Sequence, residues 1–292
     1  MTRAHSTGPV PYDLSPAALP RRIVVNLVRW CRVLLRPPRA QKALSPWPTA
    51  GVIAMIVLLT AIVGSMFLLD TSATAWARGL PRWFRPVFEE ITNFGLGSVF
   101  LYPLGVVILL LAAICSPALP RLMQGVVVAL AARFGFLFLA IGAPGLFTSI
   151  VKRMIGRARP YVGGYDNPFL YKPFIWRPEY ASMPSGHSTT AVAAAIAIGA
   201  VWPRARPVMW LYALIIMFSR IVLTAHHPSD VLAGAVVGGL GALMIRRAFA
   251  ARRLVFCPRD LRPYPWPSWR RLKALALHVV PGREQASREP RV

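Results

Sequence analysis

The amino-acid sequence predicts an all-α integral membrane protein with six transmembrane helices. Hydrophobic residues make up 55% of its 292 residues and charged residues only 15%, far below the quarter that is typical of soluble domains. The mean hydropathy is +0.50. Several uncharged runs are long enough to cross a bilayer, whose hydrocarbon core requires about 20 residues of helix.

The N-terminal third is expected to contain a surface helix, two spans and an interfacial segment. Residues 21–36 place arginines among apolar residues at helical spacing, which is typical of a basic amphipathic helix on a membrane surface. Residues 49–69 form the first uncharged run and are expected to be the first span. Residues 70–92 are aromatic but too charged to cross, so they are expected to lie at the interface. The second span is expected in residues 93–115.

The rest of the hydrophobic region is expected to contain four spans and one long loop. The loop, residues 152–183, is rich in glycine, proline and aromatic residues, and a loop of this length usually has a function. The turn before the third span is expected in residues 116–123. The four spans are expected in residues 124–151, 188–202, 207–225 and 229–245.

Two features within these spans bear on packing. Arg133 falls inside the third span, where we expect it to extend toward the nearby headgroups; pairing with a neighbouring helix is the alternative. Gly234 and Gly238 have the spacing that allows close helix packing in membranes, so we expect the last span to contact a neighbour closely.

Positive charge is concentrated at the two ends of the chain. The net charge is +24, and of the 34 Lys and Arg residues eight lie in residues 1–47 and twelve in residues 246–292. Neither end carries a nucleic-acid-binding signature, so we expect no nucleic-acid partner and instead contact with anionic lipid headgroups. We therefore divide the chain into a basic tail (1–47), a membrane domain (48–248) and a second basic tail (249–292).

The charge distribution also predicts the orientation in the cytoplasmic membrane. With both tails in the cytoplasm, 23 of the 34 basic residues lie on the inner side, as the positive-inside rule favours. Three polar segments then all fall on the outer side. They contain Lys152 and Arg159-Pro160, then Pro184-Ser185-Gly186-His187, and then Ser219-Arg220 with His226 and Asp230.

The residue types in these segments suit a phosphate ester. Lys152, Arg159 and Arg220 are donors for phosphate oxygens, and charged groups at membrane depth are costly unless they have a function. The seven-residue step from Lys152 to Arg159 places both on one face if that stretch is helical. Ser185 and Gly186 precede a span, where free N–H groups at a helix start bind anions.

The three segments resemble the type-2 phosphatidic acid phosphatase superfamily, whose pattern is K-x6-R-P, P-S-G-H and S-R-x5-H-x3-D. The resemblance covers roughly residues 50–245 and implies a six-helix bundle. It implies that His226 is the nucleophile, that His187 is the general acid and base, and that Asp230 orients His226. Lys152, Arg159, Ser185, Gly186 and Arg220 are then the phosphate ligands. His227 is the alternative nucleophile, although only His226 has the expected spacing.

The resemblance implies a metal-independent lipid phosphatase that acts at the outer face of the membrane without a cofactor. No cluster of carboxylates, histidines or cysteines in the sequence has metal-ligand spacing. Candidate substrates are undecaprenyl pyrophosphate, phosphatidylglycerol phosphate, phosphatidate and lipid A 1-phosphate. The alternatives are a phosphotransferase that uses the same site and a non-enzymatic protein that binds or moves lipids. The sequence leaves the substrate and the oligomeric state open.

Overall fold

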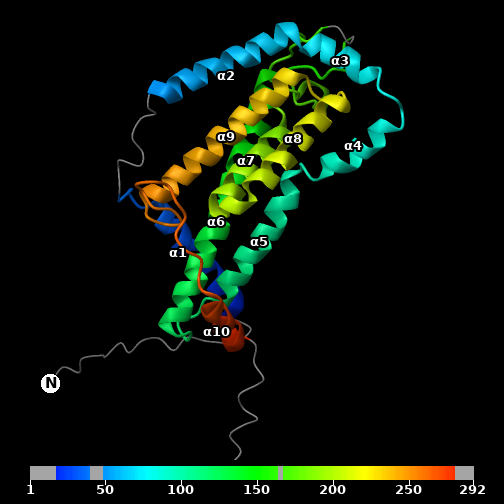
Figure 1. The fold of residues 1–292 in the computed structure, drawn as a ribbon. Helices are drawn as coiled ribbons and strands as arrows, with labels where there is room; N and C mark the ends of the chain where they lie inside the picture. The colour runs from blue at the N-terminus through cyan, green and yellow to red at the C-terminus, as the bar shows by residue number, and fades with distance from the viewer. Residues whose placement is uncertain (1–17, 40–48, 164–166, 280–292) are drawn as a thin grey trace, which may run out of the picture. The chain divides into compact units, whose positions relative to one another are not determined.

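The computed structural model describes residues 18–39, 49–163 and 167–279 (Figure 1). Parts of both predicted tails, residues 1–17, 40–47 and 280–292, lie outside the described residues. The described part of the chain is helical and has only two isolated β-bridges, Arg157 with Tyr171 and Phe256 with Pro263. The all-α prediction is therefore confirmed for that part.

The chain forms two compact units. The smaller unit comprises Met1–Arg36, Val106–Arg133 and Pro265–Val292, and the larger comprises Pro37–Gly105 and Phe134–Tyr264. Two helices contribute residues to both units, α5 (Gly97–Ile114) and α6 (Arg121–Ile155). The smaller unit also contains α1 (Leu19–Leu35) and α10 (Trp269–Val279). The larger unit also contains α2 (Thr49–Leu68), α3 (Asp70–Arg78), α4 (Phe84–Asn93), α7 (Gly186–Val201), α8 (Arg206–Val222) and α9 (Pro228–Ala251).

Five stretches in the described residues are long and apolar enough to cross a membrane. They are Thr49–Leu68, Phe84–Ile114, Arg121–Ile155, Pro203–Val222 and Pro228–Ala251. The remaining predicted span, residues 188–202 and the fourth in chain order, corresponds to α7, a shorter apolar helix of 16 residues. Residues predicted to be interfacial form two short helices, α3 and α4. The chain is thus a helical membrane protein, and its described residues contain five candidate spans.

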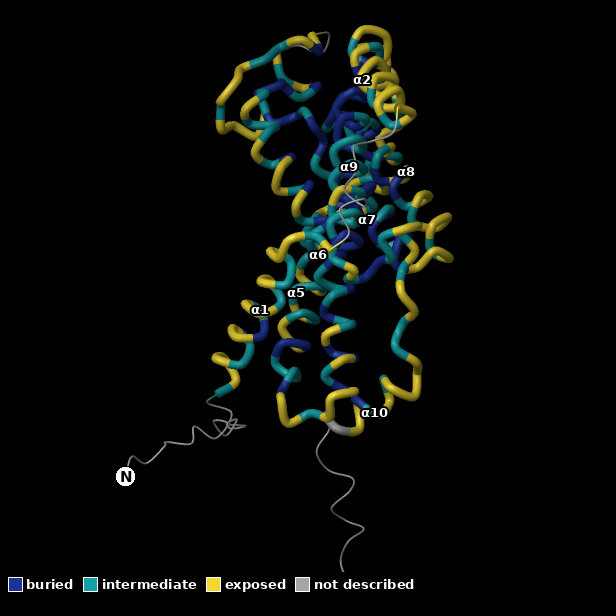
Figure 2. Tube along the Cα trace, turned by 90° about the vertical axis from the view of Figure 1, so that its left-hand side faces the viewer, coloured by how far each residue is buried: buried dark blue, intermediate teal, exposed yellow. Residues whose placement is uncertain are grey.

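Helix α7 forms the core of the larger unit. Twelve of its 16 residues are buried, and its sides pack against α8 and α9 (Figures 1 and 2). Most of those residues are alanine, serine or threonine, whose small side chains let the helices approach closely. A Cβ atom at Gly234 would collide with the Ser185 carbonyl, and one at Gly238 with the Thr189 carbonyl. The predicted close packing at the two glycines is confirmed.

Helix α2 has the opposite character, because nearly all of its apolar side chains are exposed (Figure 2). Only Ile62 and Ser65 of this uncharged helix are buried. An exposed apolar surface of this extent is unfavourable in water, whereas in a bilayer it faces hydrocarbon. The exposure of α2 therefore fits its assignment as a membrane span.

The prediction for Arg133 is wrong, because its side chain is 4% exposed and does not extend toward headgroups. It donates to the carbonyl oxygens of Ala129 at 2.9 Å and Pro265 at 2.7 Å, and its guanidinium lies 4.9 Å from the centre of the Trp266 ring. All four residues belong to the smaller unit. A buried arginine is stable here because carbonyl oxygens and an aromatic face replace water.

The chain remains folded beyond the predicted end of the membrane domain at residue 248. Helix α9 continues to Ala251. The following segment doubles back, with Cys257 N donating to Arg262 O and Tyr264 N to Val255 O, both at 2.9 Å. Its buried Phe256 contacts the ring of Phe136. The first part of the region predicted as the second tail is therefore packed against the larger unit's own helices.

Candidate active site

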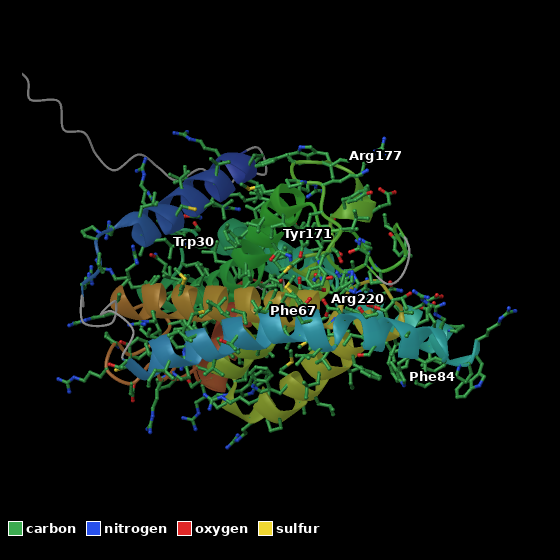
Figure 3. The ribbon with its side chains drawn as sticks, turned by 90° about the horizontal axis from the view of Figure 1, so that it is seen from above. Trp30, Phe67, Phe84, Tyr171, Arg177 and Arg220 are labelled. Atoms are coloured by element: carbon green, nitrogen blue, oxygen red, sulfur yellow. The ribbon has the colours of Figure 1, made fainter. Side chains whose placement is uncertain are left out.

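The three polar segments meet at one end of the larger unit. Lys152 is in the last turn of α6 and Arg220 in the last turn of α8, whereas Ser185 and Asp230 are at the starts of α7 and α9. His187 is within electrostatic reach of Lys152, Arg159, Arg220 and His226. Figure 3 shows nitrogen and oxygen atoms gathered around the labelled Arg220 and Tyr171. The helix order thus brings segments far apart in the sequence to one place.

The helical interpretation of the step from Lys152 to Arg159 is wrong. Helix α6 ends at Ile155, and Gly156 follows with a φ of +64°, which favours glycine. A Cβ at Gly156 would collide with the carbonyl of Lys172, so the close approach of the loop also requires glycine. Arg159 therefore lies in the loop, where its Nε donates to Pro178 O at 3.0 Å.

The start of α7 carries Ser185 and Gly186, the residues expected to bind an anion. Ser185 is the N-cap, and its Oγ accepts from Ser188 N at 3.5 Å and from Ser188 Oγ at 3.1 Å. Ser185 N donates to Asp230 O at 3.0 Å, which ties this helix start to α9. Nothing lies within 4 Å of a Cβ built on Gly186. There is therefore open space beside Gly186, and N–H groups at the start of a helix can donate to an anion.

Three cations at this end are not neutralised. Among the described residues, none of Lys152, Arg159 and Arg220 has a carboxylate within the 4.0 Å of an ion pair. Arg220 is 7% exposed, and its NH1 group donates to Thr92 Oγ1 at 2.6 Å. Positive charge that is partly desolvated and unpaired is unfavourable, so an anion bound here gains strongly.

His226 is buried beside Ser182 and Asp230. Its Nδ1 atom is 3.4 Å from Ser182 Oγ and 3.9 Å from Asp230 Oδ2. The second distance exceeds a hydrogen bond, so the predicted direct bond from His226 to Asp230 is not formed. Burial lowers the pKa of His226 to about 4. The imidazole is therefore neutral at physiological pH, as a nucleophile must be.

The adjacent His227 is held differently. Its backbone N donates to Asp230 Oδ2 at 2.9 Å, and the residue precedes the first turn of α9. The side chain is 2% exposed, and burial also lowers its pKa. Among the described residues its Nδ1 atom has no hydrogen-bond partner. His227 thus fixes Asp230 through its backbone, whereas the ring of His226 faces the serine.

Sequence reasoning missed a buried ionic network behind the histidine. Arg157 is fully buried and donates to Asp230 Oδ1 at 2.6 Å and to Asp70 Oδ2 at 2.7 Å. It also donates to Ser229 Oγ at 2.6 Å and to the carbonyl of Pro168. Both carboxylates are fully buried as well. The network joins the start of α3, the loop after α6 and the start of α9.

In this network the positive charge of Arg157 is paired with carboxylates, whereas the three cations of the site have no carboxylate partner among the described residues. Burial alone lowers the pKa of Arg157, but the carboxylates of Asp230 and Asp70 outweigh it and raise the pKa. Arg157 stays ionised and leaves one negative charge over from the two acids. This excess negative charge lies near His226, whose ring would become positive on phosphorylation.

Two signals in the sequence point to this network. Arg157 lies inside the first motif, between Lys152 and Arg159. Asp70 follows directly after the uncharged run of residues 49–69, and an acid at membrane depth usually has a partner. Ser182 carries no such signal, since a serine in a loop is common.

Helix α4 also contributes contacts to the site. Thr92 Oγ1 receives hydrogen bonds from Arg220 and from Ser219, and Arg85 NH2 donates to Thr224 Oγ1 at 3.0 Å. Just beyond α4, a Cβ at Gly95 would come within 3.0 Å of the His187 ring. Helix α4 therefore positions Arg220, and the glycine that follows it limits the space beside His187.

The described residues contain no group of three or more His, Cys, Asp and Glu side chains that could hold a metal ion. The donor set of the site is cationic, and cations attract phosphate but repel metals. The charges present can stabilise a phosphoryl group without a cofactor.

Comparison with known proteins links this site to phosphatases. Residues 133–254 match the family model described as the PAP2 superfamily. The chain is 31% identical over 220 residues to the lipid A 1-phosphatase of Rhizobium johnstonii, and the alignment covers 75% of this chain and 87% of that relative. It is 30% identical over 219 residues to the lipid A 1-phosphatase of Rhizobium etli, and that alignment covers 75% of this chain and 92% of the relative.

More distant similarities were found to two other proteins. The chain is 32% identical over 137 residues to the decaprenylphosphoryl-5-phosphoribose phosphatase of Mycobacterium tuberculosis, over 47% of this chain and 68% of that relative. Among solved structures, a transmembrane PAP2-type phosphatidylglycerolphosphate phosphatase of Bacillus subtilis gives a TM-score of 0.43 at 18% identity, over 77% of this chain and 94% of that chain.

Proposed function

The chain belongs to the PAP2 superfamily and is a phosphatase, and we propose that it hydrolyses the phosphate ester of a membrane lipid through a phosphohistidine on His226. The observation that carries this proposal is the contrast between three unneutralised cations and a neutral, buried histidine beside them. A phosphate monoester has close to two negative charges, which three cations attract, while the neutral imidazole retains a lone pair for attack.

In the first step Nε2 of His226 attacks phosphorus, and the bond from phosphorus to the ester oxygen breaks. His187 donates a proton to the departing oxygen, so the lipid leaves as an alcohol. Lys152, Arg159 and Arg220, with the first N–H groups of α7, stabilise the charge on the three non-bridging oxygens. The product of this step is a phosphohistidine.

In the second step a water molecule attacks the phosphohistidine. His187, now neutral, accepts a proton from the water, and the bond from phosphorus to Nε2 breaks. Inorganic phosphate leaves, and both histidines return to their starting protonation states. The same groups act in both steps.

The relatives and the aromatic residues of the loop after α6 support a lipid phosphate as the substrate. The Rhizobium relatives are named as lipid A 1-phosphatases and the mycobacterial relative as a phosphatase of a decaprenyl-linked phosphoribose. Both names describe a phosphate carried by a lipid. Exposed aromatic side chains on the loop after α6, at Tyr161, Phe169, Phe174 and Trp176, suit contact with lipid at the interface. We propose a lipid A 1-phosphate type of substrate first.

The proposed topology has six crossings, with α7 as the fourth. A helix of 16 residues spans about 24 Å, which is less than the hydrocarbon core of about 30 Å. Burial of α7 by its neighbours supports the assignment, because a helix that protein surrounds does not need to match the lipid thickness. The charge distribution then supports an active site facing the periplasm.

The deciding experiment is phosphate release by the purified protein from a panel of lipid phosphates in matched mixed micelles. Each phosphoryl group is tested on a long-chain lipid and on a short-chain soluble analogue. We expect kcat/KM to rise steeply with chain length, because remote binding contributes to the transition state. Equal values for soluble and lipid forms would contradict lipid specificity. Transfer to a sugar acceptor in place of phosphate release would indicate a phosphotransferase.

A further inference from the structure

We propose that Ser182 is a positioning residue whose hydroxyl joins His226 to Asp230. In this arrangement His226 Nδ1–H donates to Ser182 Oγ, and the Ser182 hydroxyl donates to Asp230 Oδ2. The inference deepens the proposed function and rests on it for its kinetic consequences. It replaces a direct histidine–carboxylate pair with a pair that a serine bridges.

The distances favour the bridge over direct contact. Ser182 Oγ is 2.6 Å from Asp230 Oδ2, within the range of a charge-assisted bond to a carboxylate, and 3.4 Å from His226 Nδ1. Nδ1 and Oδ2 are themselves 3.9 Å apart. A hydroxyl has one proton to donate, and here the carboxylate takes it. The serine can therefore only accept from His226.

The other contacts of Asp230 occupy the oxygen that lies near His226, Oδ2. Its Oδ1 accepts from Arg157 NH1 at 2.6 Å. Its Oδ2 accepts from His227 N at 2.9 Å as well as from Ser182. A carboxylate oxygen has about two acceptor sites, so both sites of Oδ2 are used. A direct bond from His226 would have to displace the serine or the backbone donor.

Ser182 is itself held firmly in place. Its backbone N donates to Arg157 O at 3.1 Å, and its side chain is fully buried. The same Arg157 holds Asp230, so one residue fixes both the bridging serine and the carboxylate. The bridge is thus built into the return of the loop toward α7.

The bridge determines which nitrogen of His226 reacts. With the proton on Nδ1, the lone pair is on Nε2, which is the nitrogen proposed to attack phosphorus. When Nε2 carries the phosphoryl group the ring becomes cationic, and the chain through Ser182 brings the charge of Asp230 to bear on it. Ser182 therefore contributes to forming the phosphohistidine more than to binding the lipid.

The kinetic test is a double-mutant cycle on the full-length protein in lipid nanodiscs. We expect Ser182→Ala to lower kcat/KM by about 10–100-fold, the range found for residues that orient metal-bound histidines, with KM little changed. Asp230→Asn should cost less in the Ser182→Ala background than in the wild type, because both changes break one path. Ser182→Thr, which keeps the hydroxyl, should retain more activity than Ser182→Ala.

The matched control is Ser65→Ala. This serine is also buried, but its hydroxyl has no hydrogen-bond partner among the described residues, so we expect no change in kcat/KM. Independent, multiplying effects of Ser182→Ala and Asp230→Asn would overturn the bridge. So would a Ser182→Ala protein as active as the wild type.

A second measurement does not depend on turnover. The chain has five histidines, so 15N-histidine NMR spectra of the wild type can be assigned by single substitutions. In the wild type we expect the His226 signals of an Nδ1–H tautomer. In Ser182→Ala we expect the proton to be no longer confined to Nδ1. An Nε2–H tautomer in the wild type would refute the bridge. Absence of phosphate release from every lipid, together with the expected tautomer, would instead refute the proposed function alone.

Discussion

Arg157 should be the most sensitive position of the molecule to loss of charge. Arg157→Met removes the guanidinium but roughly keeps the side-chain volume, so the effect of a cavity is small. The change leaves the carboxylates of Asp70 and Asp230 buried, each at 0% exposure, without their common partner. Removing one partner of a buried pair costs about 3–5 kcal/mol. At about 2–4 °C per kcal/mol, the Tm should fall by roughly 6–20 °C.

A second substitution separates charge from packing. In the wild type, Asp70→Asn removes the carboxylate that forms an ion pair with Arg157 at 2.7 Å. The substitution should therefore lower the Tm. In the Arg157→Met background the same change removes an unpaired buried charge and should raise the Tm. The sign of the Asp70→Asn effect therefore reverses between the two backgrounds.

Thermal unfolding is followed by tryptophan fluorescence in one detergent. The control is Arg177→Met, in the same loop but at an exposed position, where we expect a change within about 0.5 kcal/mol (Figure 3). An effect of Arg157→Met no larger than that of the control would refute the reasoning. The same effect of Asp70→Asn in both backgrounds would show that packing, and not charge, is responsible.

Three further predictions concern catalysis. Turnover should survive exhaustive chelation with EDTA and be inhibited by orthovanadate, which adopts the five-coordinate geometry of a transferring phosphoryl group; loss of activity that Mg²⁺ or Zn²⁺ restores would contradict this. His226→Ala should form no acid-labile phosphoenzyme, whereas His187→Ala should keep some turnover on an aryl phosphate with a good leaving group; loss of the phosphoenzyme in His227→Ala but not in His226→Ala would reverse the assignment. Because burial lowers the pKa of His226 to about 4, from an ordinary value near 6.5, the nucleophile stays neutral until the pH falls through about 4. The acid limb of phosphoenzyme formation should lie there, and a limb near pH 6.5 would show an exposed histidine.

Most of the elements could be predicted because their signals are local. An apolar run of 20 residues such as Thr49–Leu68 can only be a span or a buried helix, whatever it packs against. Ser185 marks a helix start through the chemistry of its own hydroxyl and the next few N–H groups. The positions of Lys152 and Arg220 at helix ends followed from the same kind of signal. The site could be located because its residues are at such boundaries.

The parts that could not be predicted depend on pairing over long distances in sequence. Arg157 and Asp70 are 87 residues apart, and nothing near either residue specifies the other. The bridging role of Ser182 depends on a 48-residue separation from Asp230. The prediction for Arg133 was wrong for a related reason, since its partners Pro265 and Trp266 lie more than a hundred residues away in the sequence. By contrast, the end of α6 at Ile155 lies within a few residues of the predicted end of the third span at residue 151, because the end of an apolar run is a local signal.

Two of the three arginines in the first motif, Arg157 and Arg159, explain how one short loop serves two electrostatic purposes. Arg157 is fully buried and neutralised by two acids, whereas Arg159 is partly exposed and has no carboxylate within ion-pair distance among the described residues. If Arg159 were neutralised in the same way, the phosphate would lose one of its three cations. If Arg157 were not, Asp230 would be a lone buried charge and would draw in the cations meant for the substrate. Gly156 ends α6 before either arginine, which releases both from the helix and lets the loop carry one inward to the acids and leave the other at the phosphate. Arg157 with its two acids is therefore kept apart from the unpaired cations that face the substrate. This separation keeps the site positive toward an anionic substrate while an acid remains beside the nucleophile.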